Sequence, residues 1–304
     1  KAHIPGLNIS IRKGSEEVYN GSFGYASIEE KTPVSSNTCF RIGSISKLFT
    51  AVMTLQMAEN KQFDLDHKIS DYLNSIPSKL HAITFRQLTS HTAGIRHYSK
   101  EEIASYNTTN YPNLIEALNR FQNDSLLFEP GSSIRYSSYG YVLLGAVIEK
   151  ITNQSFTALA IKNIFDKANM SHSKFDQLPF NSSRDIARFY TFDKSLYTEA
   201  KTEDYSYKWP ASGSLSTPSD LSLFASRLLD NTLINQQSLQ TMLSMQVTSK
   251  KQSSGFGIGF RLANDHFKRP VAHHGGEVEG SRAFMILYPE EKISIAMAAN
   301  VYKA

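Results

Sequence analysis

Cysteine is almost absent from this sequence: Cys39 is the only one, so no disulfide can form within the chain. A lone cysteine of this kind is typically a small buried hydrophobic residue. Long hydrophobic runs are absent as well, and no stretch approaches the roughly 20 apolar residues that a membrane span requires. We therefore expect no integral membrane span in these residues.

Charge of one sign is also scarce. The 304 residues carry a formal net charge of +4, and no block of lysine or arginine stands out, so the sequence gives little support to nucleic-acid binding. No histidines and cysteines show metal-ligand spacing; His273 and His274 are adjacent, and neighbours on a strand point to opposite faces. We expect neither a metal nor another cofactor. A small-molecule or peptide substrate remains as the partner, and the oligomeric state stays open.

What the sequence does contain is a change of periodicity along the chain. Leu7, Ile9 and Ile11 alternate with other residues, which is typical of a strand. From Ser44 onward the apolar residues follow a helical period, and further helical patterns run through the middle of the chain. Extended patterns return near the C-terminus, at 255–262, 268–276, 281–289 and 292–300.

Strands at both ends and helices between them predict an α+β fold, an α/β sandwich with one antiparallel sheet built from the two termini and flanked by helices. We expect the sheet domain to comprise residues 1–42 and 211–304, and an inserted, mostly helical domain to comprise residues 43–210. A cleft between two such parts is a natural place for a site. Ser44 lies where strand gives way to helix.

The segment RIGSISKLFT, residues 41–50, places two serines and a lysine at the start of the first helical pattern. On a helix Ser44 and Lys47 stand at i and i+3 and share a face, whereas Ser46 points elsewhere. A serine hydroxyl needs a neighbouring base to become a nucleophile. A lysine amine can be that base when burial or nearby positive charge lowers its pKa. The alternative is an ordinary helix start, with Ser44 as N-cap and Lys47 in solvent.

Two further segments carry residues suited to the same chemistry. Tyr136 in RYSSYGYVLLG precedes a strong helical pattern, and a tyrosine in a cleft acts as a base when cations depress its pKa. In VAHHGGEVEG, His274 ends a strand and Gly275 and Gly276 follow, where a substrate could approach the backbone closely. Taken singly, the first segment fits an interface tyrosine better than a catalytic one, and the second fits a turn glycine pair with an exposed histidine better than a substrate site.

Taken together, the three segments resemble the motifs of the serine β-lactamase and penicillin-binding-protein superfamily. The tyrosine of the second motif resembles the class C branch, which includes D-alanyl-D-alanine carboxypeptidases, D-aminopeptidases and esterases. Other segments also resemble recurrent family segments, in order and over nearly the whole chain, and ARFYTFDK is similar to the mitochondrial β-lactamase-like serine proteases. The motifs are Ser44-Ile45-Ser46-Lys47, Tyr136-Ser137-Ser138 and His274-Gly275-Gly276.

The resemblance implies acyl transfer through a covalent acyl-enzyme, with Ser44 as the nucleophile and with Lys47 and Tyr136 sharing the transfer of its proton. It also implies an oxyanion hole formed by the backbone N–H groups of Ser44 and Glu277, and a His274 that hydrogen-bonds toward Tyr136 or the substrate. No metal is implied. The expected substrate-binding positions are Ser138, Gly213, Gly275 and Gly276.

Three features depart from the family pattern. Ser138 stands where asparagine is frequent, which puts hydrogen bonding from this position to Lys47 or to a substrate amide in doubt. His274 replaces the lysine of class C β-lactamases, and since histidine is mostly neutral at pH 7, a fixed positive charge for a carboxylate is lost. The family's C-terminal helix, which covers the sheet, is missing before Ala304, so we expect a tail that was removed or lies beyond this sequence.

We therefore expect a serine hydrolase that acts on a peptide, a D-amino-acid peptide or an ester. A true class C-like β-lactamase is the alternative within this class, and a non-hydrolytic penicillin-binding-like sensor or filament scaffold is the alternative outside it. The sequence starts at Lys1 rather than at Met, so an export signal would not be visible. The resemblance makes the bacterial periplasm or cell surface the expected location.

Overall fold

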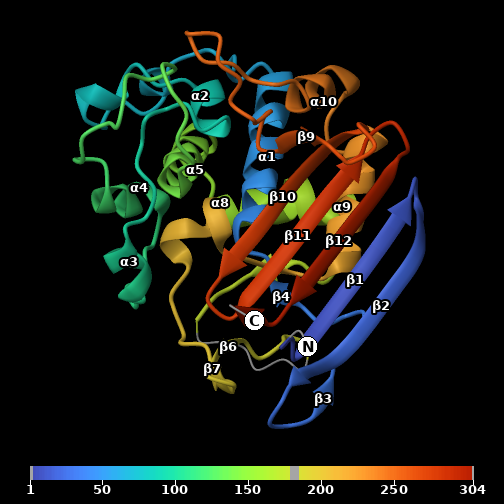
Figure 1. Cartoon of the computed structure of the whole chain (residues 1–304). Coiled ribbons are helices and arrows are strands. Elements are labelled where there is room, and N and C mark those ends of the chain that lie inside the picture. The colour runs from blue at the N-terminus through green and yellow to red at the C-terminus, as the bar shows by residue number, and fades with distance from the viewer. Residues whose placement is uncertain (1–2, 179–184, 303–304) are drawn as a thin grey trace.

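The largest element of the fold is a seven-stranded sheet built from both ends of the chain (Figure 1), in a computed structural model that describes residues 3–178 and 185–302. In order across the sheet, its strands are β3 (Thr32–Pro33), β2 (Glu16–Ser27), β1 (Gly6–Lys13), β12 (Ile293–Ala299), β11 (Ser281–Tyr288), β10 (Pro270–Val278) and β9 (Arg261–Asn264). All neighbours are antiparallel, which confirms the predicted sheet. Leu7 pairs with Ala299 and Lys13 with Ile293, so β1 and β12 join the two ends of the chain.

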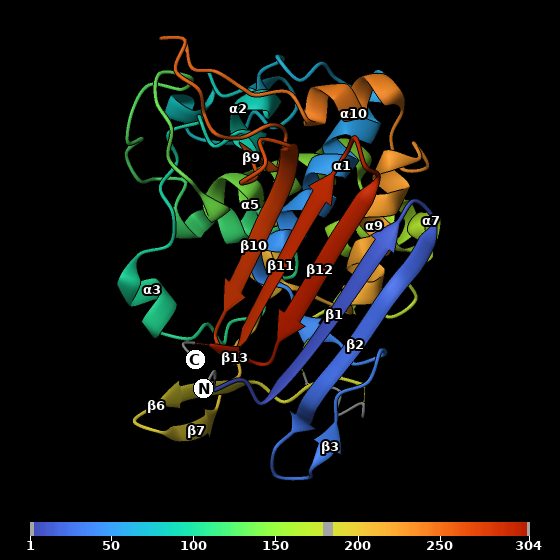
Figure 2. The ribbon, with the colours of Figure 1, turned by 45° about the vertical axis from the view of Figure 1, so that its right-hand side comes forward.

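Most of the helices lie in the middle of the chain, and the last ones precede the C-terminal strands. They are α1 (Ser46–Glu59), α2 (Phe85–Thr89), α3 (Lys100–Ala104), α4 (Leu114–Ala117), α5 (Ser138–Thr152), α6 (Phe156–Ala160), α7 (Asp166–Ala168), α8 (Trp209–Ser212), α9 (Pro218–Leu229) and α10 (Gln236–Met242). Figure 2 shows α1 and α9 behind the same face of the large sheet, and α9 packs against β1 and β12. None of the helices in the described ranges combines the length and the apolar character needed to cross a membrane.

Two small sheets bring strands into the segment that the sequence predicts as mostly helical. Residues 43–210 contribute β5 (Lys174–Phe175), β6 (Tyr190–Asp193) and β7 (Leu196–Glu199). One sheet has the order β4 (Phe40–Arg41), β8 (Ser214–Ser216), β5, and the other has the order β13 (Val301–Tyr302), β6, β7. The predicted helical insertion is therefore tied to both flanking segments by strand pairing, and its boundaries at 43 and 210 stay a prediction.

The predicted strand at 255–262 is wrong over most of its length, because the regular strand β9 begins only at Arg261. The glycines that mimic strand alternation serve close packing instead. A Cβ atom at Gly257 would collide with the carbonyl of Met242, and Gly259 adopts a φ of +88° against Ala51. Only glycine adopts such a φ without strain. The alternating glycines therefore reflect close contacts of the backbone with neighbouring residues and not a β-strand.

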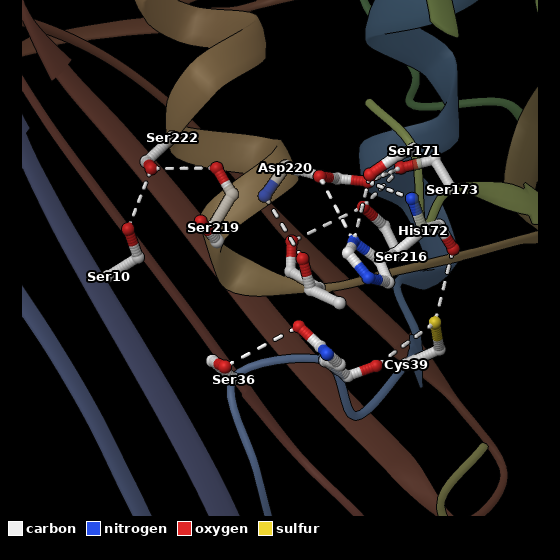
Figure 3. Close-up of polar contacts among 12 residues, drawn as sticks. Ser10, Ser36, Cys39, Ser171, His172, Ser173, Ser216, Ser219, Asp220 and Ser222 are labelled. Carbon is white, nitrogen blue, oxygen red and sulfur yellow. Dashed lines mark hydrogen bonds and ion pairs between the residues drawn. The ribbon is translucent and has the colours of Figure 1, made fainter. Parts of the chain in front are cut away.

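Strand β1 shows the predicted alternation, but its buried face is the polar one. Asn8, Ser10 and Arg12 are buried, whereas Leu7, Ile9 and Ile11 are half-buried on the other face. The reason is the helix that covers this strand. As Figure 3 shows, the Ser10 hydroxyl lies 2.7 Å from that of Ser222 in α9, so a hydroxyl-rich helix meets a hydroxyl-bearing strand.

The start of helix α9 is fixed by a side-chain cap and by hydrogen bonds to a neighbouring loop. The Thr217 side chain caps the helix by accepting a hydrogen bond from the Asp220 amide at 3.0 Å, and Pro218 occupies the first turn. The Asp220 carboxylate in turn accepts from the His172 amide at 2.9 Å and from the Ser173 hydroxyl at 2.8 Å (Figure 3). These bonds fasten the loop after α7 to the start of α9.

Candidate functional site

Ser44 lies in a single 3-10 turn, η1 (Gly43–Ile45), directly before α1. The N-cap residue of α1 is Ile45, without a side-chain hydrogen bond, so Ser44 does not cap this helix. Its half-buried hydroxyl is thus free for other partners. Ser46 has a structural role, because its hydroxyl donates to the Gly43 carbonyl at 2.8 Å and accepts from the Ser214 amide at 3.3 Å.

Lys47 lies in the first turn of α1 and its side chain is fully buried. Its Nζ lies 3.2 Å from the Ser44 hydroxyl, 2.9 Å from the Ser138 hydroxyl and 2.8 Å from the Ala211 carbonyl. None of the ion pairs among the described residues involves it. Burial, and secondly the charge of Lys208, hold the Lys47 pKa well below its ordinary value, which favours the neutral amine that a base requires.

Tyr136 lies between the first motif and the end of the sheet, with its ring centroid 5.0 Å from the Lys47 Nζ. Burial raises the pKa of Tyr136 to about 12, although hydrogen bonding to Ser44 and the charge of Arg261 act in the opposite direction. The condition under which Tyr136 would be a base, a pKa depressed by cations, is therefore not met, because removal from water outweighs the charge of Arg261. At neutral pH Tyr136 is a phenol, which can donate a proton but is not a phenolate base.

Ser138 begins α5 and accepts a hydrogen bond from the Lys47 amine at 2.9 Å. A serine at this position therefore replaces the frequent asparagine without losing the contact to the lysine. Interaction with Ser138 also acts to lower the pKa of Tyr136, so this serine lies close to both the lysine and the tyrosine.

His274 lies in β10 and is buried, with 1% of its surface exposed. Its Nδ1 is 2.7 Å from the Gly275 carbonyl, which can only accept, so the proton of the neutral ring is on Nδ1. The Nε2 atom has no hydrogen-bond partner among the described residues, and the ring centroid is 6.2 Å from that of Tyr136. The expected hydrogen bond to Tyr136 is therefore not formed. Burial and the charge of Lys47 lower the His274 pKa to about 3, so the ring is uncharged at pH 7.

Two glycines bring η1 and β10 unusually close together. A Cβ atom at Gly276 would collide with the Ile42 carbonyl and lie 3.1 Å from the Ser44 amide nitrogen. A Cβ atom at Gly43, which has a φ of +49°, would lie 2.7 Å from the Glu277 amide nitrogen. The amides of Ser44 and Glu277 are therefore neighbours across this contact, as an oxyanion hole requires.

These groups open onto a cavity of about 480 Å³. Lys47 and Gly276 lie behind the residues that line the cavity. Gly213 does not line the cavity either, because it packs against the Trp209 side chain. The neighbouring Ser212 lines it instead. The predicted residues that line the cavity are Ser44, Tyr136, Ser138, His274, Gly275 and Glu277.

Several charged and polar residues of this cavity were not predicted from the sequence. Lys208 is buried and pairs with Glu203 at 2.8 Å. Arg261 lies over the Tyr136 ring, with its guanidinium carbon 5.6 Å from the centroid. His97 also lines the wall. No short motif marks these residues, because each reaches the cavity from a separate segment of the chain.

A second cluster of serine, histidine and aspartate is not a catalytic triad. The Ser171 hydroxyl and the Asp220 carboxylate both face the same atom, the Nδ1 of His172, at 3.2 and 3.9 Å (Figure 3). A proton relay needs the acid on one ring nitrogen and the serine on the other. This cluster therefore anchors α9, and the Ser44 site remains the candidate.

Known proteins resemble this chain over nearly its whole length. A family model described as Beta-lactamase matches residues 1–303. The human serine beta-lactamase-like protein LACTB, mitochondrial, is 25% identical, in an alignment that covers 94% of this chain and 69% of LACTB. Protein flp of Staphylococcus aureus is 26% identical over 99% of this chain and 60% of its own length. The chain thus spans about two thirds of the length of these curated relatives.

Solved structures show the same fold. The octameric penicillin-binding protein homologue from Pyrococcus abyssi superposes with a TM-score of 0.85 at 24% identity, over 98% of this chain and 70% of that one. A D-stereospecific amidohydrolase from Streptomyces sp. gives a TM-score of 0.82 at 22% identity, over 98% and 90%. The family match supports a serine hydrolase. The chain belongs to the Beta-lactamase family.

Proposed function

We propose that this protein is a serine hydrolase that cleaves a peptide, a D-amino-acid peptide or an ester through a covalent acyl-enzyme on Ser44. The observation that carries this proposal is the Lys47 amine, buried without a carboxylate partner among the described residues and 3.2 Å from the Ser44 hydroxyl. A buried amine without a counter-charge destabilises a fold. Its presence beside a half-buried serine at a cavity is accounted for by use as a base.

The three contacts of Lys47 fit the neutral amine, which has two N–H groups and one lone pair. The Ala211 carbonyl can only accept, so it takes one N–H, and the Ser138 hydroxyl takes the other. The lone pair then faces the Ser44 hydroxyl. Ser44 gives its proton to Lys47 while its oxygen bonds to the substrate carbonyl carbon, and the carbonyl π electrons move to the oxygen.

The remaining steps use groups that already surround Ser44. The developing oxyanion accepts hydrogen bonds from the Ser44 and Glu277 amides. The Tyr136 phenol gives its proton to the leaving nitrogen or oxygen as that bond breaks, and the Lys47 ammonium restores it through the Ser138 hydroxyl. A water molecule then gives one proton to Lys47 as its oxygen bonds to the ester carbon. When the bond between that carbon and the Ser44 oxygen breaks, the Lys47 ammonium returns the proton to Ser44, so the acid is released and both residues are regenerated.

Arg261 supports a substrate that carries a carboxylate near the scissile bond. It has no ion pair with any residue in the described ranges, and its guanidinium lies over the Phe256 and Tyr136 rings at 4.5 and 5.6 Å. It therefore supplies the fixed positive charge that His274 lacks at pH 7. Peptides carry such a carboxylate, and so do β-lactams, which keeps the class C-like β-lactamase as the second candidate.

The test is a substrate screen with the wild-type chain, Ser44→Ala and the matched control Ser46→Ala. We expect the wild type and Ser46→Ala to hydrolyse at least one of an activated ester, a peptide or a D-aminoacyl amide, the last suggested by the Streptomyces amidohydrolase. Ser44→Ala should lose both turnover and labelling by a serine-reactive phosphonate, read as intact mass. Labelling retained in Ser44→Ala but lost in Ser46→Ala would overturn the assignment.

Three other outcomes separate the alternatives. Rapid hydrolysis of a chromogenic cephalosporin, with no turnover of peptides or esters, would identify a β-lactamase. Stoichiometric acylation of Ser44 without turnover would identify a sensor. Concentration-dependent polymers of a chain that no phosphonate labels would identify a scaffold.

A further inference from the structure

Two histidines outside the three motifs hold the second motif from behind. The Ser137 amide donates to Nδ1 of His91 at 3.2 Å, and the Ser138 amide donates to Nδ1 of His97 at 3.1 Å. The Arg135 amide donates to the His91 carbonyl at 3.0 Å. The backbone amides on both sides of Tyr136 are therefore bound by His91, and the next amide along is bound by His97.

The two imidazole rings also contact the Tyr136 side chain. The ring centroid of His91 lies 4.4 Å from that of Tyr136, and the centroid of His97 lies 5.4 Å from it, edge-on. His91 is buried, with 2% of its surface exposed, and has a φ of +62°. A non-glycine residue in this conformation is strained and persists where the surroundings require it. In this conformation the carbonyl and the ring of His91 both accept hydrogen bonds from the backbone beside Tyr136.

We propose that His91 and His97 are positioning residues that fix the Tyr136 phenol beside Ser44, acting through Nδ1 atoms that accept the amides of Ser137 and Ser138. This inference rests on the proposed function, in which Tyr136 protonates the leaving group. Neither histidine exchanges a proton with the substrate in this scheme. Their contribution is orientation, and a displacement of about 1 Å at a reacting group reduces a rate by about 100-fold.

The acceptor role requires both rings to be neutral with the proton on Nε2. Burial, followed by the charge of Lys47, lowers the His97 pKa to about 4 and holds the His91 pKa well below its ordinary value. The other charged or titratable groups that act on them are His274, Arg261 and His97 for His91, and Arg135, Glu102 and Arg96 for His97. Only Glu102 favours the charged form, so both acceptors are intact at neutral pH.

The test compares an acceptor with a non-acceptor at each position. Asparagine places Oδ1 where Nδ1 stands and tolerates a positive φ, whereas leucine removes the acceptor at similar volume. For hydrolysis of a peptide or an amide, whose leaving nitrogen must be protonated, we expect His91→Leu and His97→Leu to lower kcat by about 100-fold with KM within twofold. His91→Asn and His97→Asn should recover most of that loss. If His91→Leu does not fold, the half-buried His97 provides the same comparison.

A double-mutant cycle with Tyr136→Phe separates positioning from general stability. When the phenol is absent, His97→Leu should lower kcat by less than twofold further, because no hydroxyl remains to be positioned. Full additivity, or a folded His97→Leu enzyme with wild-type kcat, would overturn the inference. If Tyr136→Phe alone leaves kcat unchanged, the proposed role of Tyr136 fails instead, so the two failures are distinguishable.

Discussion

Two buried cations on the same stretch of chain have opposite surroundings. Arg41 ends β4 with its Nε 2.7 Å from the Asp176 carboxylate, and the two side chains are 4% and 3% exposed. Lys47 is equally buried but meets only two hydroxyls and a carbonyl. Burial acts to lower the pKa of Arg41, but the charges of Tyr205 and Asp176 outweigh it and raise that pKa. The pKa of Lys47 is lowered.

The difference between the two surroundings corresponds to a structural role for Arg41 and a chemical role for Lys47. An ion that is buried with a counter-charge stays charged and joins segments, here β4 and the loop after β5, whose residues are distant in sequence. An amine that is buried without a counter-charge loses its proton more easily, and the neutral amine can then accept one. The missing carboxylate, rather than the lysine itself, distinguishes the site.

The largest effect should come from replacing the unpaired cation. Lys47→Met should lower kcat for an activated ester by about 10⁴-fold or more, because the nucleophile loses its base. The folded-state pKa of Lys47 lies below its unfolded value, so its contribution to stability is present above pH 10.5 and is lost as the pH falls toward the folded pKa. Lys47→Met should therefore gain in Tm relative to the wild type between pH 9 and pH 6. A constant difference across that range would contradict a depressed pKa.

The paired cation should respond in the opposite way, with loss of stability rather than of chemistry. Asp176→Asn leaves Arg41 buried without a counter-charge and should lower the free energy of unfolding by about 3–5 kcal/mol, measured in urea. The activity of the folded fraction should stay within a few fold of the wild type. The control is Glu30→Gln, which removes an exposed pair with Arg188 and should change stability by less than about 1 kcal/mol. Equal effects of the two substitutions would remove the distinction.

A third change tests the backbone of the site without altering any charge. Gly276→Ala forces β10 away from Ile42, separates the two amide donors and should lower kcat by about 10²–10³-fold. Gly275→Ala is the matched control, since its Cβ atom would meet only the Phe284 ring, at 3.7 Å. If both variants retain activity, the Ser44 and Glu277 amides are not the oxyanion donors.

The last prediction concerns the neutral histidines around Lys47. The folded-state pKa values of His97 and His274 are about 4 and about 3, below their ordinary value near 6.5. Their contribution to stability is therefore present above pH 6.5 and is lost as the pH falls toward 4, by about 1.4 kcal/mol per pH unit for each histidine. Thermal unfolding between pH 7.5 and 4.5 should show this loss, with a shallower slope in His97→Asn. An identical slope would contradict it.

The sequence predicts the sheet and the three motifs because both depend on local patterns. Alternation marks β1, and the spacing of Ser44 and Lys47 marks a shared helical face. Lys208, Arg261 and His97 could not be found in this way, since only tertiary packing brings them to the cavity. The raised pKa of Tyr136 could not be predicted either, because burial is not visible in a sequence. The glycines near residue 257 follow the alternation of a strand, and the close contacts for which they are needed are likewise not visible in the sequence.

The pairing of β1 with β12 has a consequence for biosynthesis. Strand β1 leaves the ribosome long before its partner β12, so the hairpin of β1 and β2 keeps one unpaired edge until β12 has been synthesised. An open strand edge invites pairing with other chains. The same delay applies to the oxyanion contact, because β10 joins η1 only late in synthesis. Until β10, β11 and β12 have been synthesised, the chain therefore exposes a strand edge that is open to pairing and has no assembled site, which couples activity to the synthesis of these three strands.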